Sequence, residues 1–238
     1  MDLLQAENKR KIAVWTCTNA CNLNCKFCFG KEKRLELNTE HAKKLIKKIS
    51  ARKIKYFVFS GGEPLLRRDI FILADFVRKL GMKVFLHTNG VLIDENNISN
   101  IIKHFDLINL PIDGANETTN YAIGRGSLKH TLKVLDLLAT KRNVRITTVA
   151  TKTNLNEIKK IAALLKNRPI KQWRIFQFDP KLGEARANKK IFEITPSEFE
   201  KLKKSLSAHE KINAEFIPMN SDFDKTYWMI SSDGKIIR

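Results

Sequence analysis

The sequence predicts an α/β fold, a partial (βα)6 TIM-like barrel with a C-terminal helix and strand extension. Six short apolar segments alternate with segments in which apolar residues recur at the helical period. This alternation is typical of a parallel sheet covered by helices. The 238 residues leave no room for a full eightfold barrel, which takes ~250 residues.

The expected elements follow in order. Strands are expected over residues 11–17, 55–60, 83–88, 106–112, 144–151 and 173–179. Helices are expected over residues 38–51, 68–80, 94–104, 127–141 and 154–167, with Asn38 and Asn154 as N-caps. We expect residues 1–190 to form the barrel. Residues 191–238 should pack on it within a single structural domain, as a helix over 196–208, a strand over 212–217 and a hairpin near 225–237.

Composition restricts the class of protein. No apolar run approaches the roughly 20 residues that span a bilayer, so no membrane association is expected. The N-terminal residues lack the apolar stretch of a signal peptide, which predicts a cytoplasmic protein. The net charge of +19 favours an anionic partner such as a nucleotide, RNA or an acidic peptide. Most of the lysines are expected on solvated helix faces.

Three cysteines lie close together in the segment CNLNCKFCFG, directly after the first expected strand. Clustered cysteines in a reducing compartment indicate a metal site rather than disulfides. Cys21, Cys25 and Cys28 suit an iron–sulfur cluster, and because a 4Fe–4S cluster normally takes four thiolates, three would leave one iron open. Zinc is the alternative, although a closed zinc site needs four ligands. Cys17 is expected as a buried apolar residue.

Polar turns follow the next strands, at the edge of the sheet where α/β proteins place their sites. In FSGGEPLL, Gly61 and Gly62 allow the backbone to approach a ligand, and Glu63 can accept from an ammonium group. Asn89 could bind a ribose hydroxyl or serve as a turn residue. Asp113 has the same ambiguity between a ligand contact and a cap.

These motifs resemble the radical S-adenosylmethionine (SAM) superfamily, through the three cysteines, Phe27 and the Gly-Gly-Glu-Pro turn. The resemblance implies a 4Fe–4S cluster whose open iron binds SAM. It also implies reductive cleavage of SAM to a 5′-deoxyadenosyl radical. The Gly-Gly-Glu-Pro segment would then hold the methionine amino group. An electron donor such as ferredoxin or flavodoxin would be a partner.

Three further stretches, AIGRGSLKH, WRIFQ and DKTYWMISSDGKI, resemble the viperin-like enzymes. That resemblance implies dehydration of a nucleoside triphosphate, CTP or a related one, to its 3′-deoxy-3′,4′-didehydro form. Arg125 would pair with the SAM carboxylate, as a guanidinium fork does well. The resemblance assigns the nucleotide, and mainly its triphosphate, to Arg145, Arg174, Tyr227 and Lys235. The structural alternatives are that each arginine points outward to solvent or to a carboxylate, and that Tyr227 packs in the core.

The chain departs from viperins at several positions. Val14 and Thr16 replace an asparagine and a histidine, Pro111 replaces a serine, and Thr147 replaces an asparagine. The chain also ends at Arg238, where viperins continue with a tail. These departures concern CTP specificity more than SAM chemistry.

Two other functions remain open from the sequence. One is a radical SAM enzyme that acts on a peptide or tRNA. The other is a non-enzymatic iron–sulfur protein that binds nucleic acid through its basic surface.

Overall fold

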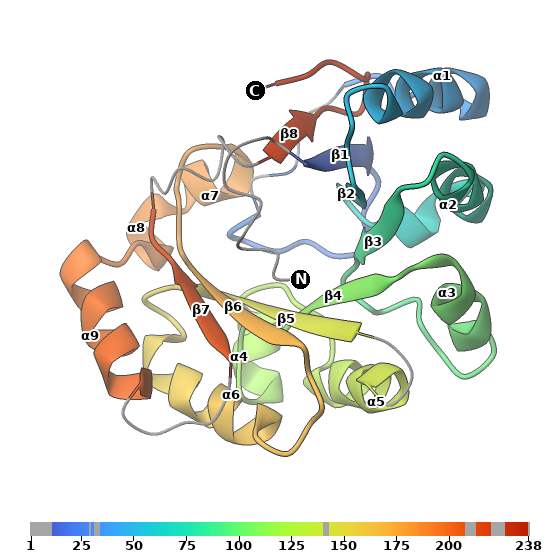
Figure 1. Cartoon of the computed structure of the whole chain (residues 1–238). Helices are drawn as coiled ribbons and strands as arrows, with labels where there is room; N and C mark the ends of the chain where they lie inside the picture. Colours follow the sequence, from blue (N-terminus) through green and yellow to red (C-terminus); the bar gives the residue numbers. More distant parts are fainter. Residues whose placement is uncertain are drawn as a thin grey trace.

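A single parallel sheet with helices on its outer side forms the body of the molecule (Figure 1). The computed structural model describes residues 11–28, 30, 34–139, 143–207, 213–219 and 227–237. In that part of the chain the strand order is β7-β6-β5-β4-β3-β2-β1-β8, and every neighbouring pair is parallel. The sheet curves into a half-barrel, which confirms the predicted fold class.

The strands match the expected ranges closely. They are β1 (Ile12–Thr18), β2 (Tyr56–Gly61), β3 (Lys83–His87), β4 (Leu107–Pro111), β5 (Asn143–Ala150), β6 (Gln172–Gln177), β7 (Ala214–Ile217) and β8 (Tyr227–Ile230). The helices are α1 (Thr39–Ser50), α2 (Ile70–Lys79), α3 (Ile98–His104), α4 (Glu117–Ala122), α5 (Leu128–Ala139), α6 (Ile158–Leu165), α7 (Gly183–Ala187), α8 (Lys189–Phe192) and α9 (Pro196–Ser207). Short 3-10 turns cover Pro64–Leu66 and Leu155–Glu157.

Eight strands form the sheet instead of the expected six, because β7 and β8 join its two edges. β8 pairs with β1 in parallel, with Ile12 opposite Tyr227. The parallel pairing of β8 with β1 was not expected. The expected hairpin around Ser-Ser-Asp-Gly is present in the described part of 225–237: an antiparallel bridge joins Ile230 to Ile236, and the Ile237 amide donates to the Met229 carbonyl at 2.8 Å. Residues 225 and 226 lie outside the described residues. Positions 140, 141, 208 and 212, at the ends of other expected elements, also lie outside them.

The two faces of the sheet bury different residues because side chains alternate along a strand. Ala13, Trp15 and Cys17 of β1 point outward into the large core under the helices. Ile12 and Val14 point to the concave face, where they form a smaller apolar cluster. The concave face is the interior of the half-barrel.

Of the two expected N-caps, Asn38 caps α1 through its side chain, which accepts from the His41 amide at 2.9 Å. Asn154 is at the N-cap position of the 3-10 turn Leu155–Glu157, directly before α6, but its side chain makes no capping bond there. Its buried side chain accepts from the Thr151 amide at 2.8 Å and donates to the carbonyl oxygens of Asp113 and Val149. Asn154 therefore ties the loop after β5 to the loop after β4.

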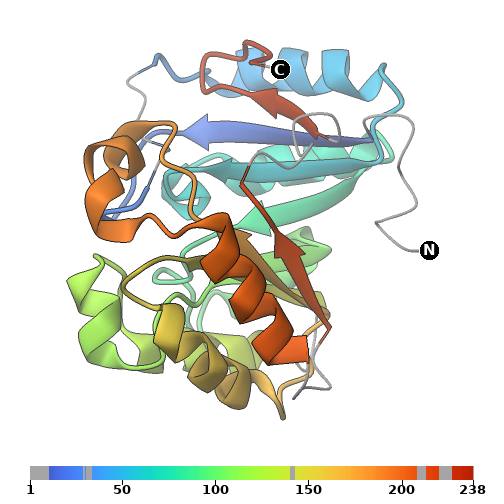
Figure 2. The same ribbon diagram turned by 90° about the vertical axis from the view of Figure 1, so that its left-hand side faces the viewer.

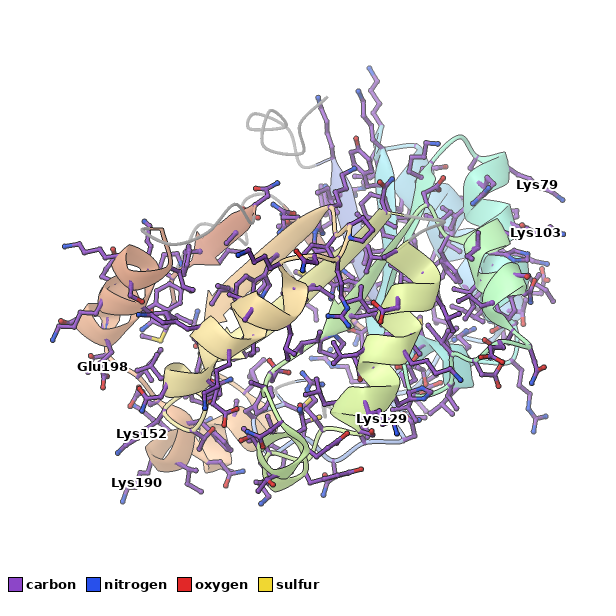
Figure 3. All side chains as sticks on the ribbon, turned by 90° about the horizontal axis from the view of Figure 1, so that it is seen from below. Lys79, Lys103, Lys129, Lys152, Lys190 and Glu198 are labelled. Carbon is purple, nitrogen blue, oxygen red and sulfur yellow. The ribbon has the colours of Figure 1, made fainter. Side chains whose placement is uncertain are left out.

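The helices carry the basic surface. Figure 3 shows Lys79, Lys103 and Lys190 at the periphery, pointing away from the sheet, and all three are exposed. Many of the lysines are thus solvated, as expected. Among the described helices, none has the length and apolar character that a membrane crossing needs.

Candidate active site

Three loops meet at the carboxyl edge of the sheet, around the cysteine loop that follows β1. The Gly62 amide donates to the Thr18 carbonyl at 2.8 Å, which joins the loop after β2 to the loop after β1. The Lys26 amide donates to the Ile123 carbonyl at 3.0 Å, which joins the cysteine loop to the end of α4. Helices α7 and α8 lie beside the carboxyl end of β1 (Figure 2), and the Ala185 amide donates to the Cys28 carbonyl at 3.1 Å.

Each cysteine sulfur atom of this loop has an N–H group near it. The donors are Asn89 Nδ2 at 3.9 Å from Cys21, Arg125 Nη1 at 3.3 Å from Cys25, and the Gly30 amide at 3.3 Å from Cys28. Hydrogen bonds to the sulfur atoms are among the factors that set the potential of an iron–sulfur cluster. The loop is therefore held by contacts that suit thiolate ligands.

Burial distinguishes the cysteines. Cys25 is buried, and burial raises the pKa of its thiol, although the charge of Arg125 acts in the opposite direction. Cys21 is exposed and Cys28 is intermediate. Cys17 is fully buried in the core under the helices, as predicted, and burial raises the pKa of its thiol strongly.

The donor set suits an iron–sulfur cluster in type and number. In the part of the chain that the structure describes, no three His, Cys, Asp or Glu side chains are grouped as the ligands of one metal ion. In a 4Fe–4S cluster each thiolate binds a different iron, so three separated thiols on one loop fit in type and number.

Gly61 and Gly62 are needed for contact with the cysteine loop. Gly61 has a φ of +135°, and a Cβ atom on it would lie 2.4 Å from the Thr18 carbonyl oxygen. A Cβ atom on Gly62 would lie 2.1 Å from the Ala20 carbonyl oxygen. The sequence prediction was that these glycines let a ligand approach. In the structure the close neighbour is the protein's own backbone.

Glu63 is fully buried and its carboxylate is occupied by protein donors. Oε1 accepts from Thr88 Oγ1 at 2.7 Å and from the Leu65 amide at 3.0 Å, and Oε2 accepts from the Asn89 amide at 2.7 Å. Burial raises the pKa of Glu63, and these hydrogen bonds act against that rise. Glu63 thus fastens the loop after β2 to the loop after β3. A carboxylate has about four acceptor positions, and these three protein donors take most of them.

Asn89 and Asp113 also make contacts within the protein. Asn89 Nδ2 donates to Asn22 Oδ1 at 2.7 Å, which holds the β3 loop against the cysteine loop. Asp113 is 1% exposed; its Oδ1 accepts from the Val149 amide at 2.7 Å and its Oδ2 accepts from Arg125 Nε at 2.7 Å. Asp113 therefore holds Arg125 in place.

Arg125 lies between Asp113 and the cysteine loop. Its Nε pairs with Asp113, its Nη1 faces Cys25 Sγ, and its guanidinium carbon is 5.1 Å from the centre of the Phe27 ring. Gly124 before it has a φ of +81° and packs against the Asn24 carbonyl. These contacts place one guanidinium beside a cysteine sulfur atom.

A second group of polar residues lies on the concave face. We call it the concave cluster, and it consists of His87, Arg145, Gln172, Arg174, Glu215 and Tyr227. The strand register brings them together, because His87 is opposite Asn109, Asn109 is opposite Arg145, and Arg145 is opposite Gln172. Arg174 is opposite Glu215 in the next pair of strands.

One chain of hydrogen bonds connects five members of the concave cluster. Arg145 Nε donates to Gln172 Oε1 at 2.9 Å, and Gln172 Nε2 donates to Glu215 Oε2 at 2.7 Å. Arg174 Nε donates to the same Glu215 oxygen at 2.7 Å, and its Nη1 donates to the Tyr227 hydroxyl at 3.2 Å. Arg145 is 4% exposed and Arg174 is 8% exposed. Both arginines are therefore buried, so neither points out to solvent, whereas pairing with a carboxylate, the other structural alternative, is found for Arg174.

Positive charge dominates the concave cluster. Burial, followed by the neighbouring charge of Arg174, lowers the pKa of Arg145 to about 10. Burial, followed by the charges of Arg145 and Arg174, lowers the pKa of His87 to about 3, so its ring is neutral at physiological pH. Within the described residues, Arg145 has no carboxylate within salt-bridge distance, whereas Arg174 has Glu215.

Lys235, the remaining predicted substrate residue, is not a member of the concave cluster. Lys235 is exposed and its ammonium group lies 3.5 Å from Asp233, so its described contacts are at the surface. Thr147, on the concave face, donates to Asn109 Oδ1 at 2.7 Å. Sequence reasoning missed His87, Gln172 and Glu215. Their strands read as apolar runs, and a polar residue within such a run is the signal that could have found them.

Comparisons with known proteins identify the family of this chain. The model of the family described as "Radical SAM superfamily" matches residues 15–165. An S-adenosylmethionine-dependent nucleotide dehydratase of Flammeovirga pacifica is 26% identical over 230 residues, which cover 90% of this chain and 78% of that protein. An AdoMet-dependent heme synthase of Methanosarcina barkeri is 29% identical over 208 residues, which cover 84% of this chain and 58% of that protein.

A solved structure gives the same fold. The crystal structure of Streptococcus suis SuiB bound to S-adenosylmethionine matches with a TM-score of 0.79 at 18% identity. The match covers 96% of this chain and 60% of the SuiB chain. The chain therefore spans about three fifths of the length of two of the proteins it resembles.

Proposed function

Because the chain belongs to the radical SAM superfamily, we propose that it is a radical SAM enzyme whose substrate is a nucleoside triphosphate. The proposed reaction is the dehydration of CTP or a related nucleotide to its 3′-deoxy-3′,4′-didehydro form. The nucleotide dehydratase of Flammeovirga pacifica supports this substrate class, since it aligns with 90% of this chain.

The observation that carries the proposal is the way in which the two buried arginines are held. Arg145 and Arg174 are each fixed through Nε, by Gln172 and Glu215 respectively. Guanidinium groups held at Nε keep terminal N–H groups for a ligand, and their planar fork matches phosphate oxygens. Two buried guanidinium groups beside one carboxylate leave an excess of positive charge, which an anionic ligand would neutralise.

The expected affinity is sufficient for a nucleotide site. A charge-assisted hydrogen bond contributes about 1.5–3 kcal/mol, and micromolar binding corresponds to about 8 kcal/mol. Three or four such contacts therefore account for micromolar binding. Arg145 and Arg174 supply several donors between them.

We call the residues around the cysteine loop at the carboxyl edge of the sheet the edge site, and it would hold the cofactors. Cys21, Cys25 and Cys28 would ligate a 4Fe–4S cluster, and SAM would bind beside it, against the loop of Glu63 and the guanidinium of Arg125. When bound, these cofactors supply a 5′-deoxyadenosyl radical after one-electron reduction by an external donor such as ferredoxin or flavodoxin. Asp113 would orient Arg125 toward this site through the bond at Nε.

In the proposed reaction, the ribose C4′ hydrogen atom of the nucleotide is removed. The 3′ hydroxyl then takes a proton and leaves as water, and one further electron from the external donor completes the 3′,4′ double bond. The concave cluster would contribute by binding, with Arg145 and Arg174 on the phosphates, so that the ribose is presented toward the carboxyl edge.

The test is an anaerobic assay of the reconstituted protein with dithionite, SAM and CTP, UTP, GTP or ATP in turn. We expect one nucleotide to stimulate formation of 5′-deoxyadenosine and to yield a product lighter by one water. An intact cluster that forms no 5′-deoxyadenosine would favour a non-enzymatic nucleic-acid-binding protein instead. Deoxyadenosine formation stimulated by a peptide or tRNA, and by no nucleotide, would overturn the substrate assignment.

A tetrapyrrole is the second candidate substrate, favoured by the 29% identity with the AdoMet-dependent heme synthase of Methanosarcina barkeri. The carboxylates of such a substrate would also pair with buried arginines. The same assay with an iron porphyrin distinguishes the two. A modified porphyrin, with no nucleotide product, would replace the nucleotide proposal.

A further inference from the structure

Glu215 supplies the carboxylate of the concave cluster, and it contacts two other members of the cluster directly. It lies on β7 opposite Arg174, and its Oε2 accepts from both Arg174 Nε and Gln172 Nε2 at 2.7 Å. Through Gln172 it is also connected to Arg145. One carboxylate oxygen thus orients both arginines.

The charges of the concave cluster do not balance. Arg145 and Arg174 contribute two positive charges and Glu215 contributes one negative charge, while His87 is neutral. Among the described residues, the cluster therefore carries one net positive charge. A ligand anion must bind next to a carboxylate that already neutralises one arginine.

We propose that Glu215 is a built-in counter-ion that makes the concave cluster select ligands by their number of phosphates. This inference rests on the proposed function and adds a residue that sets its specificity. Glu215 disfavours anions with one phosphate and is overcome by anions with three.

The physical argument compares two ligands. A single phosphate has one group of oxygens to offer, and near Arg174 these oxygens meet the like charge of Glu215, which is unfavourable in a partly buried site. A triphosphate can engage the terminal N–H groups of Arg145 and of Arg174 at the same time, because its phosphates are spaced along a chain. Its additional contacts offset the repulsion.

Glu215 also protects the empty site. Burying two guanidinium groups without a counter-charge costs free energy, and such groups would bind any small anion of the cell. With its carboxylate on Arg174, the cluster is partly neutralised before a substrate arrives. The side chain of Glu215 is 26% exposed, so this carboxylate is not sealed inside the protein.

The experiment measures binding of CMP, CDP and CTP to the cluster-loaded protein by isothermal titration calorimetry. Glu215→Gln keeps the shape and an acceptor for Arg174 but removes the charge. We expect Glu215→Gln to bind CMP about tenfold more tightly, and CTP less than about threefold more tightly. The ratio of the CMP to the CTP dissociation constants therefore falls.

Two further variants make the result specific. Glu40→Gln removes a charge of the same sign from the exposed face of α1, where Glu40 pairs with Lys43, and it should leave the ratio unchanged. Glu215→Asp keeps the charge and should keep most of the preference for CTP. This variant tests the inference even where Glu215→Gln fails to fold.

The outcomes separate the two proposals. An unchanged ratio in Glu215→Gln, or weaker binding of all three nucleotides, would overturn the role of Glu215 while leaving the nucleotide site intact. The same holds if Glu215→Asp loses the preference for CTP. Absence of binding of all three nucleotides to the wild-type protein would overturn the proposed function, and the role of Glu215 with it.

Discussion

The edge site and the concave cluster are built in different ways. The edge site uses short contiguous motifs, in which neighbouring residues pack against the cysteine loop through backbone atoms, as Gly61 and Gly62 do. The concave cluster takes two side chains from β6 and one each from β3, β5, β7 and β8. The first kind of site has its geometry within the motif, whereas the second exists only because the strand order brings its members together.

This difference predicts that the two regions can be inactivated separately. The edge site should control cluster assembly and SAM cleavage, and the concave cluster should control nucleotide binding. The following variants test that separation, from the largest expected effect to the smallest.

Cys25→Ala should abolish the cluster, because a buried thiol of the cysteine loop is removed. We expect the iron and sulfide content and the visible absorption to fall to background, with nucleotide binding retained in calorimetry. Cys17→Ala is the matched control. It should keep the cluster and lose only some unfolding free energy, since Cys17 lies in the core under the helices. Loss of CTP binding in folded Cys25→Ala would break the separation.

Arg174→Gln should have the opposite effect. It removes the guanidinium that bridges Glu215 and Tyr227, and we expect the affinity for CTP to fall about 10- to 150-fold, which corresponds to the loss of one charge-assisted contact. The iron content should not change. Arg168→Gln, which removes a pair with Asp136 on the outer surface, should bind CTP normally. Equal affinities of Arg174→Gln and wild type would contradict the phosphate assignment.

Much of the edge site could be predicted from the sequence, but its detailed roles could not. The cysteines, the glycine pair and Arg125 lie in recognisable motifs, and the structure brings them to one edge. The hydrogen-bond partners of the residues in these motifs could not be predicted. That Glu63 accepts from Thr88 and from the Asn89 amide depends on how two loops pack, which motif spacing does not determine.

The C-terminal segment shows what a local signal can and cannot predict. The turn at Ser-Ser-Asp-Gly predicted the hairpin that joins Ile230 to Ile236. The pairing of β8 with β1, which lies at the other end of the chain, was not predicted. Long-range pairing of this kind also creates the contact between Tyr227 and Arg174. The side-chain bonds of Asn154 were missed for the same reason, since its hydrogen-bond partners include a loop more than 40 residues away.

Glu63→Gln should weaken the edge site by destabilising its loops. Two N–H donors and one hydroxyl now bond to the carboxylate, and a glutamine amide would turn an NH2 group toward at least one of them. We expect the unfolding free energy to fall by about 1–3 kcal/mol, the cost of a buried unsatisfied donor. Urea unfolding against Glu40→Gln measures it. No difference between the two variants would show that Glu63 does not fasten these loops.

His87 should make the protein less stable in acid. Its folded-state pKa, about 3, lies below the ordinary value of about 6.5, so below that value the unfolded state binds a proton that the folded state does not. Stability therefore falls as the pH decreases. Between pH 6.5 and 5.5, wild type should lose about 1 kcal/mol more than His87→Gln. His41→Gln, at an exposed position, should behave as wild type. Equal losses in wild type and His87→Gln would show that His87 titrates normally.

The most direct test of the central claim uses CTP that carries deuterium at C4′. If the edge site generates the radical and the concave cluster presents the ribose to it, one deuterium should appear in the 5′-deoxyadenosine, and the nucleotide product should lack one water. Arg174→Gln should lower this transfer at subsaturating CTP. Formation of 5′-deoxyadenosine without deuterium, at the same rate with and without CTP, would contradict the account.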